Sequence, residues 1–389
     1  MISISRQALH SSKDLLFDGT IHWTNETSDV WKFGTKRTAK SAEALIETCG
    51  GEIPNLIPEE FMKSMSGIAK GKVPWPLIIP YGLFVEHLET LKTEVDNAID
   101  DLDGYEKTLA EIRNVIEKLQ PSKIEKSIYK SIIQETSSSI VESFKPDEDG
   151  FVEPPVYSHK TATGRLVVKS GPSILTLKKE YRRMLTSRFN NGSMMMIDFT
   201  SLEPRVLRLL SNGHAAQDIY DDISKKFNGS VTRSQAKLAT LKLLYGSSMS
   251  SIASDVGSLK RNVVKDIESY FGLPALKEKL SKELHNNRKI KNFWGRPLHE
   301  ACDDHLLVSH YTQSTAVDVG LKGFNQIINK IEDEDLQVVP CYLIHDAMIV
   351  DVDPSSMKRL EEIVEEGVEV EGIGHFNLSF KQAYLEDEE

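Results

Sequence analysis

Two aspartates, Asp198 and Asp346, stand at the ends of continuous apolar runs that are typical of buried strands. Asp198 closes the run 194–199, and Asp346 lies between the runs 338–344 and 347–352. Burying a carboxylate is costly unless its charge is compensated, and a divalent cation is the usual compensator. Two such acids brought together would suit two-metal phosphoryl transfer with Mg²⁺. For either acid alone, a strand-end cap or a turn residue is the simpler interpretation.

A second group recurs at every fourth position and consists of Arg233, Lys237, Leu241 and Tyr245. Helical spacing would place these four residues along one face. Two cations followed by an apolar and an aromatic side chain would suit a triphosphate site that leads to a base-stacking site. An amphipathic helix whose basic face is merely solvated explains the same four residues, so the spacing alone leaves both interpretations open.

The elements that must position these residues can be predicted from periodicity and capping signals. The first apolar run predicts a buried strand that delivers Asp198 to its end. The segment LEPRVLRLLS predicts a helix directly afterwards, with Pro204 in its first turn. Thr232 and Gly246 predict the start and the end of the helix that carries the basic face. The two later runs predict a tight hairpin with Asp346 at its tip.

Upstream of these elements, apolar residues at helical spacing predict three helices and one linker. The helices are expected after Pro80 in 82–99, over 109–119 and over 124–133, and the turn-rich segment 146–155 is expected to be the linker.

Composition narrows the class of protein. The 389 residues are 40% hydrophobic and 27% charged, which is ordinary for a globular chain. No apolar run approaches the roughly 20 residues of a membrane span, and the N-terminus lacks a signal-peptide core. The three cysteines lie far apart, so neither a disulfide framework nor a zinc spacing is indicated. A reducing, cytosolic setting fits best.

The charge is distributed unevenly along the chain. A net charge of -11 argues, taken whole, against a nucleic-acid binder. Residues 159–296, however, contain 25 basic and 11 acidic residues, a net charge of +14, and the remainder carries -25. We therefore expect one basic cleft on an otherwise acidic body.

Blocks between residues 161 and 352 resemble, in order, the motifs of family A, polymerase I-like DNA polymerases. They comprise motifs A, B and C, the blocks that precede motifs A and C, and a segment that follows the fingers. In chain order they are TATGRL (161–166), DFTSLEPRVLRLLS (198–211), RSQAKLATLKLLYGSS (233–248), GRPL (295–298), QSTAVD (313–318) and YLIHDAMIVDV (342–352).

The resemblance implies roles for the residues singled out above. Asp198 and Asp346 would be the metal ligands and would hold two Mg²⁺ ions, which Mn²⁺ can replace. Arg233 would bind the incoming triphosphate. Lys237 would bind it as well and could protonate the departing pyrophosphate. Tyr245 would border the nascent base pair.

Other matched positions concern the sugar, the phosphates and the DNA. Glu203 matches the position that favours deoxyribose over ribose. Leu241 replaces an aromatic residue that packs on the incoming sugar and base, and Tyr220 replaces a histidine. Contacts with DNA are implied for Arg165 and Gln313 in the minor groove, for His345 beside the primer end, and for a basic block comprising Lys178, Arg182 and Arg183.

Three further positions depart from the family pattern. Ala347 stands where a third acid often follows motif C, and His305 and Ser309 replace residues that commonly precede Gln313. These losses affect the expected fidelity and speed more than the reaction itself.

The implied fold is α+β, a right-hand polymerase with an antiparallel palm sheet, helical fingers and a helical thumb. The expected divisions are an N-terminal region of unknown role (1–75), the start of the palm (76–99), the thumb (100–146), the palm with motif A (147–211), the fingers with motif B (212–296), and the palm with motif C and a C-terminal tail (297–389).

The implied function is template-directed DNA synthesis on a primed template from deoxynucleoside triphosphates, without a proofreading exonuclease. A phage or plasmid type would suit so compact a chain, acting in a bacterial or phage-infected cytoplasm. A separate exonuclease, primase, helicase or processivity factor would be a possible partner. A catalytically silent polymerase-like DNA-binding subunit and a single-subunit RNA polymerase are the two alternatives.

Overall fold

The computed structural model describes residues 105–384 except 160, 258, 288–289 and 299–305. The chain divides into two compact units. The smaller unit comprises residues 1–110 and 295–299, and the larger unit comprises residues 111–294 and 300–389. Several predictions on the sequence lie outside the described residues, namely the helix in 82–99, the region 1–75, the palm segment 76–99 and the role of His305.

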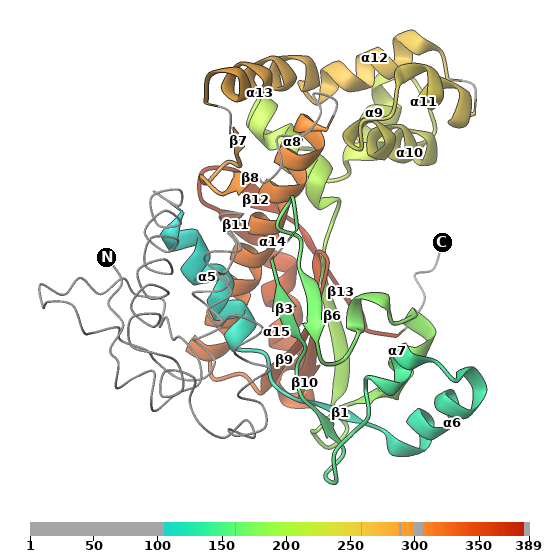
Figure 1. Ribbon diagram of the computed structural model, residues 1–389, viewed down its shortest axis with the longest axis vertical. Coiled ribbons are helices and arrows are strands. Elements are labelled where there is room, and N and C mark those ends of the chain that lie inside the picture. The colour runs from blue at the N-terminus through green and yellow to red at the C-terminus, as the bar shows by residue number, and fades with distance from the viewer. Residues whose placement is uncertain (1–104, 160, 258, 288–289, 299–305, 385–389) are drawn as a thin grey trace, which may run out of the picture. The chain divides into compact units, whose positions relative to one another are not determined.

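A four-stranded antiparallel sheet lies within the larger unit (Figure 1). In the order in which they pair, its strands are β13 (Leu378–Gln382), β6 (Ser193–Phe199), β10 (Ala347–Val352) and β9 (Val338–Ile344). Every residue of β10 is buried, as are most residues of β6 and β9. This burial explains why these strands read as continuous apolar runs, and the predicted strand and hairpin are confirmed.

The hairpin turn places one predicted metal ligand beside the other. His345 and Asp346 connect β9 to β10, and His345 has a φ of 53°, the left-handed conformation that two-residue hairpin turns favour. The backbone N–H of Phe199 donates to the carbonyl of Asp346 at 3.1 Å. The turn is therefore tied to the end of β6, and Ala347 pairs with Asp198.

Two helices follow or cover the end of β6. Helix α8 (Leu202–Asn212) begins three residues after Phe199, with Pro204 in its first turn as predicted, and α14 (Leu307–Asp333) packs against it. At Gly323 of α14, a Cβ would lie 2.6 Å from Cζ of Phe199. Only glycine permits this approach, so α14 packs directly on the strand end that carries Asp198.

The region predicted to form the fingers is helical and has an apolar core of its own, which includes Ile223, Val264 and Ile267. Its helices are α9 (Ile219–Lys226), α10 (Arg233–Leu244), α11 (Met249–Asp255), α12 (Arg261–Tyr270) and α13 (Leu273–Asn287). Thr232 and Gln235 form a reciprocal capping box at the start of α10. This confirms the predicted helix start.

The residues before β6 form small elements. They are α5 (Glu106–Glu117), β1 (Ser122–Ile124), α6 (Lys126–Thr136), α7 (Ser139–Glu142), β2 (Phe151–Val152), β3 (Val156–Ser158), β4 (Val167–Ser170), the 3₁₀ segments η2 (Ile174–Thr176) and η3 (Lys179–Met184), and β5 (Leu185–Thr186). The helix predicted over 124–133 begins only at Lys126, because Ile124 belongs to β1, which pairs with β2 and β5. The segment 146–155 forms a turn that leads into β2 and lies within the larger unit.

The remaining elements are β7 (Ile290–Lys291), β8 (Pro297–Leu298), α15 (Pro354–Glu366), β11 (Val368–Val370) and β12 (Gly374–Phe376). Helix α15 begins after Asp353, whose carboxylate accepts a hydrogen bond from the backbone N–H of Ser355. Among the helices of the described residues, none has the length and hydropathy needed to span a membrane.

Candidate active site

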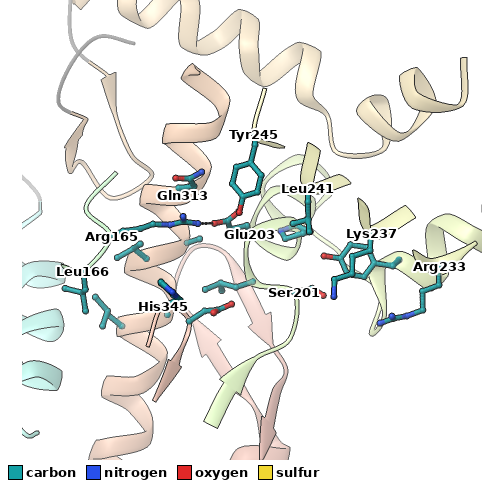
Figure 2. Close-up of a pocket in the computed structure, with 18 residues that line it drawn as sticks. Arg165, Leu166, Ser201, Glu203, Arg233, Lys237, Leu241, Tyr245, Gln313 and His345 are labelled. Atoms are coloured by element: carbon teal, nitrogen blue, oxygen red, sulfur yellow. Dashed lines mark hydrogen bonds and ion pairs between the residues drawn. The ribbon is translucent and has the colours of Figure 1, made fainter. Parts of the chain in front are cut away.

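A pocket of about 460 Å³ collects most of the predicted site residues (Figure 2). Its walls come from α8, α9, α10, α14, the β9–β10 turn and the segment after Gly164. The predicted site residues in its lining are Arg165, Glu203, Tyr220, Arg233, Lys237, Leu241, Tyr245, Gln313, His345 and Asp346. Segments that lie far apart in the sequence thus meet at one site.

Asp346 occupies the end of this pocket formed by the hairpin turn. Burial raises the pKa of Asp346 above its usual value, and the negative charge of Glu203 raises it further. The positive charges of Arg165 and Lys381 act in the opposite direction without cancelling the rise. Asp346 is therefore a carboxylate whose charge is only partly compensated by the protein.

Asp198 lies on the neighbouring strand and is not part of the pocket lining. Its carboxylate Oδ2 is 3.4 Å from Nζ of Lys381 on β13, and about a quarter of the Asp198 side chain is exposed (27%). Its charge also acts on Arg182 of η3, whose pKa is nevertheless lowered because burial outweighs that attraction. The two acids are thus adjacent, and cations lie near both.

The basic face of α10 lines the opposite part of the pocket. Arg233, Lys237, Leu241 and Tyr245 all belong to the lining, as the four-residue spacing predicts. Arg233 and Lys237 are exposed, and Tyr245 is 46% exposed. Leu241 is partly buried between them. The helix therefore presents two accessible cations and an accessible ring on one side of the pocket.

Arg233 pairs with an acid that the sequence analysis did not single out. Its Nε donates to Asp218 Oδ2 at 2.7 Å, and its guanidinium lies 5.7 Å from the centre of the Tyr220 ring. Asp218 is also the N-cap of α9. Burial raises the pKa of Asp218, but hydrogen bonds, including the one from Arg233, outweigh this and lower it overall.

Arg165, Glu203 and Tyr245 form a polar row across the pocket (Figure 2). Nη2 of Arg165 donates to Oε1 of Glu203, and the phenol of Tyr245 also interacts electrostatically with the Arg165 side chain. Burial lowers the pKa of Arg165, but Glu203 and Tyr245 raise it overall, so the guanidinium remains charged. The row thus joins Glu203, which is predicted to select the sugar, to Arg165, which is predicted to contact DNA.

Tyr220 lies in the pocket wall and is 4% exposed. Burial raises the pKa of Tyr220, and the neighbouring Ser201 acts in the opposite direction without cancelling the rise. Tyr220 therefore contributes mainly the face of its ring, beneath Arg233, to the pocket surface.

The residues predicted to contact DNA divide into those at the pocket and those elsewhere. Gln313 lines the pocket, and its Nε2 donates to Ser309 Oγ at 3.0 Å. His345 lines it too, and its pKa is lowered by desolvation and by the positive charges of Arg165 and Arg182.

The three members of the basic block differ in their contacts. Arg182 is the one close enough to interact electrostatically with Asp198 and His345. Lys178 instead pairs with Glu180 at 3.6 Å, and Arg183 pairs with Glu135 at 3.8 Å. None of the three residues lines the pocket.

The donor set agrees with hard, oxygen-ligated cations. Across the described part of the chain, no group of three or more His, Cys, Asp and Glu side chains is arranged to hold a metal. Ala347 occupies the place beside Asp346 where a third acid would stand. Magnesium commonly uses one or two carboxylates and completes its octahedron with water and substrate phosphates. Asp198 and the incompletely compensated Asp346 therefore fit such an ion.

An antiparallel sheet that presents two carboxylates beside a basic helix face is an arrangement suited to phosphoryl transfer. The chain belongs to DNA polymerase family A, because the model of that family matches residues 81–382. The predicted α+β right-hand polymerase fold is thereby confirmed, whereas the divisions into palm, fingers and thumb stay predictions.

One solved structure to which the chain is similar is the POL domain of Pol1 from M. smegmatis in complex with DNA primer-template and dNTP. It is 16% identical to this chain with a TM-score of 0.46, and the match covers 89% of this chain and 64% of that one. A search of curated proteins found no match to the chain.

Proposed function

We propose that the protein is a template-directed DNA polymerase that adds deoxynucleotides to a primer 3′-hydroxyl and releases pyrophosphate. One observation carries the proposal: Asp346 lines the same pocket as Arg233 and Lys237, and Asp198 pairs with Ala347, the residue that follows Asp346. Carboxylates for metal ions and cations for phosphates are the two requirements of phosphoryl transfer by positioning and charge neutralisation.

Asp198 and Asp346 would hold two Mg²⁺ ions, which Mn²⁺ can replace. When bound, such ions supply charge neutralisation at the attacking and leaving oxygens. The half-buried position of Asp346 favours this role, because a dication would compensate the desolvated carboxylate.

Arg233 and Lys237 would bind the triphosphate, to which both are accessible. Lys237 would also hold a proton at Nζ for the departing pyrophosphate. The Tyr220 ring under Arg233 supports the guanidinium, which must leave Asp218 or share it with the phosphates.

The polar row would position the sugar and the primer end. Glu203 would restrict the space and solvation near the sugar C2′, and Tyr245 would border the nascent pair beside Leu241. Arg165 and Gln313 would contact the minor groove, where acceptors are similar for every base pair. His345 and Arg182 lie beside Asp346 and Asp198 and would meet the primer end and its phosphates.

The finer features of the role belong to the same proposal. We infer a phage- or plasmid-type enzyme in a bacterial or phage-infected cytoplasm, with a separate exonuclease as a partner. A primase, helicase or processivity factor would be a partner. Because residues 159–296 carry a net charge of +14, binding of primed DNA should weaken steeply as salt rises.

Primer extension by wild type, Asp198→Asn and Asp346→Asn tests the proposal. We expect each variant to lose about a thousandfold or more in rate, because several kcal/mol of charge stabilisation are removed. Asp333→Asn, at the exposed end of α14, is the matched control and should extend like wild type. Full activity in either site variant would refute the proposal.

The two alternatives are tested in the same assay. A wild type that binds primed DNA without extending it would indicate a silent subunit, which the replacements Leu241 and Ser309 favour. An RNA polymerase would instead prefer ribonucleotides. For a DNA polymerase, Glu203→Ala should increase ribonucleotide use relative to deoxynucleotide use, whereas wild type discriminates against ribonucleotides.

A further inference from the structure

Lys381 is the cation that lies against a predicted metal ligand, and no sequence motif drew attention to it. It belongs to β13, the strand that pairs with β6 along the side opposite β10. In the register of the two strands, Lys381 pairs with Met196 and Ser379 pairs with Asp198. Lys381 and Asp198 are therefore diagonal neighbours on one sheet face, a separation that a long side chain can bridge.

Lys381 and Asp198 form a partly exposed ion pair. Nζ of Lys381 lies 3.4 Å from Oδ2 of Asp198, and the exposed fractions of the two side chains are 29% and 27%. The positive charge of Lys381 also acts on Asp346, where it opposes the rise in the pKa of that carboxyl. One ammonium group thus acts on both carboxylates.

An ammonium group and a magnesium ion cannot use the same carboxylate oxygen in the same way. Magnesium requires oxygen ligands at about 2.1 Å in near-octahedral order. An ammonium contact at 3.4 Å has no such demand and is easily exchanged, because it is partly exposed and is not bidentate. A positive charge this close also repels a dication.

We propose that Lys381 is a positioning residue that competes with the metal for Asp198 and thereby holds metal affinity down. The inference rests on the proposed role of Asp198 and Asp346 as metal ligands. The triphosphate of an incoming nucleotide brings negative charge that offsets the lysine. Metal binding thereby becomes coupled to the arrival of substrate.

Arg182 does not fulfil this role, although its charge also interacts with Asp198. Its Nη1 is directed to Met196 Sδ at 3.8 Å, and it comes from η3 rather than from the sheet. The charged atom of Lys381, by contrast, lies within ion-pair distance of the Asp198 carboxylate.

Binding of Mn²⁺ to the full chain, followed by electron paramagnetic resonance of the free ion, tests the proposal without catalysis. Wild type is compared with Lys381→Met, Lys381→Gln and Lys381→Arg. The two neutral variants should bind Mn²⁺ about two- to fivefold more tightly, the range expected for loss of one partly exposed charge. Lys381→Arg should remain close to wild type.

Lys330→Met is the matched control, because Lys330 forms a 2.8 Å ion pair with Glu366 between α14 and α15. It should leave Mn²⁺ affinity unchanged. Adding a non-hydrolysable deoxynucleotide should narrow the difference between wild type and Lys381→Met. The magnesium concentration for half-maximal primer extension should fall in Lys381→Met, and thermal unfolding verifies that each variant is folded.

The outcomes separate this inference from the proposed function. If Asp198→Asn loses Mn²⁺ binding while both neutral Lys381 variants bind as wild type does, the competition is refuted and the metal site stands. Weaker Mn²⁺ binding in Lys381→Met would also overturn the competition. If Asp198→Asn and Asp346→Asn both bind Mn²⁺ like wild type, the proposed metal site itself fails.

Discussion

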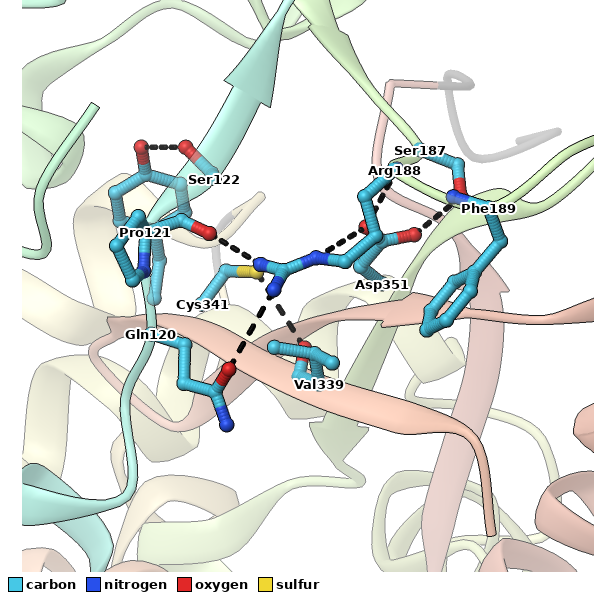
Figure 3. Close-up of polar contacts among 10 residues, drawn as sticks. Gln120, Pro121, Ser122, Ser187, Arg188, Phe189, Val339, Cys341 and Asp351 are labelled. Carbon is cyan, nitrogen blue, oxygen red and sulfur yellow. Dashed lines mark hydrogen bonds and ion pairs between the residues drawn. The ribbon is translucent and has the colours of Figure 1, made fainter. Parts of the chain in front are cut away.

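The two ends of the β6–β10 pair carry aspartates in opposite electrostatic situations. At one end, Asp351 is fully buried, with 0% exposure, and is surrounded by donors (Figure 3). Ser187 Oγ donates to its Oδ1, and the backbone N–H and Nε of Arg188 donate to its Oδ2 at 2.8 and 3.2 Å. At the other end, Asp198 has a 3.4 Å contact with Lys381 and remains partly exposed.

The cations that serve the two ends differ in the same way. The guanidinium of Arg188 is held on its far side as well, because it donates to the carbonyl of Pro121 and to Gln120 Oε1. It cannot leave Asp351 without losing several hydrogen bonds. Cys341 lies beside this pair, and burial raises the pKa of its thiol to about 12. We call this end, with Asp351 and Arg188, the closed end, and the end with Asp198 and Asp346 the open end.

One residue type on one pair of strands therefore occurs in two settings, fully buried among donors at Asp351 and partly exposed beside a lysine at Asp198. A fully buried carboxylate whose two oxygens both accept hydrogen bonds has a structural role, because removal of one member of such a pair leaves an uncompensated buried charge. A carboxylate with a long contact from lysine, or with a pKa raised by burial, is available to a dication.

The largest effect expected on stability comes from breaking the closed end. Asp351→Asn should lower the free energy of unfolding by about 3 kcal/mol, because the Arg188 charge loses its buried partner. Urea denaturation measures this. The rate of primer extension per folded molecule should stay near that of wild type.

The double variant Arg188→Met with Asp351→Asn is the control for this prediction. It should be less destabilised than Asp351→Asn alone, because no unpaired charge then remains. If the free energy of unfolding of Asp351→Asn lay within roughly 0.5 kcal/mol of the wild-type value, the buried pair would not be structural.

At the open end, an Asp→Asn substitution is expected to change the free energy of unfolding in the opposite direction. Because the folded-state pKa of Asp346 is raised, its ionisation costs stability as pH rises from below the unfolded-state pKa through the folded-state pKa. Asp346→Asn should therefore gain stability relative to wild type as the pH is raised over the range that begins near the usual aspartate pKa of about 3.9, although it loses activity. Urea midpoints across this range give the slope.

Asp353→Asn supplies a control of opposite sign. Hydrogen bonds from Ser355 lower the pKa of Asp353, so its stabilising effect is present at neutral pH and is lost on acidification. Asparagine can still cap α15. Relative to wild type, this variant should lose stability as pH rises, and equal slopes for both variants would contradict the contrast.

The elements with strong local signals were the ones that sequence could predict. The strand ending at Asp198, the hairpin around Asp346 and the helix after Thr232 each have a continuous apolar run or a cap of their own. The start of α6 was misplaced because Ile124 also satisfies helical spacing. In the structure Ile124 belongs instead to β1, which pairs with both β2 and β5.

The residues that sequence reasoning missed depend on tertiary register. Lys381 meets Asp198 only because β13 pairs with β6 at a particular offset, which no local pattern encodes. Asp218 was detectable as a helix cap but not as the partner of Arg233. The basic block likewise gave no sign that Arg182, rather than Lys178 or Arg183, would lie near Asp198.

The smallest effect concerns the second Arg–Asp pair, which repeats the chemistry of the closed end in an open setting. The exposed fractions of the Arg233 and Asp218 side chains are 57% and 40%, whereas those of Arg188 and Asp351 are 21% and 0%. Water screens the exposed pair, so it contributes little to stability and Arg233 can exchange Asp218 for phosphate.

Asp218→Asn removes the competing charge and retains a side-chain oxygen that can cap α9. We expect the KM for deoxynucleotides to fall by about two- to threefold with little change in kcat, the size of a screened surface pair. Steady-state extension kinetics measure this, and urea unfolding should show almost no change. A KM that does not fall, or a stability loss as large as that of Asp351→Asn, would show that this pair is closed as well. Exposure would then not be what separates a substrate-binding arginine from a structural one.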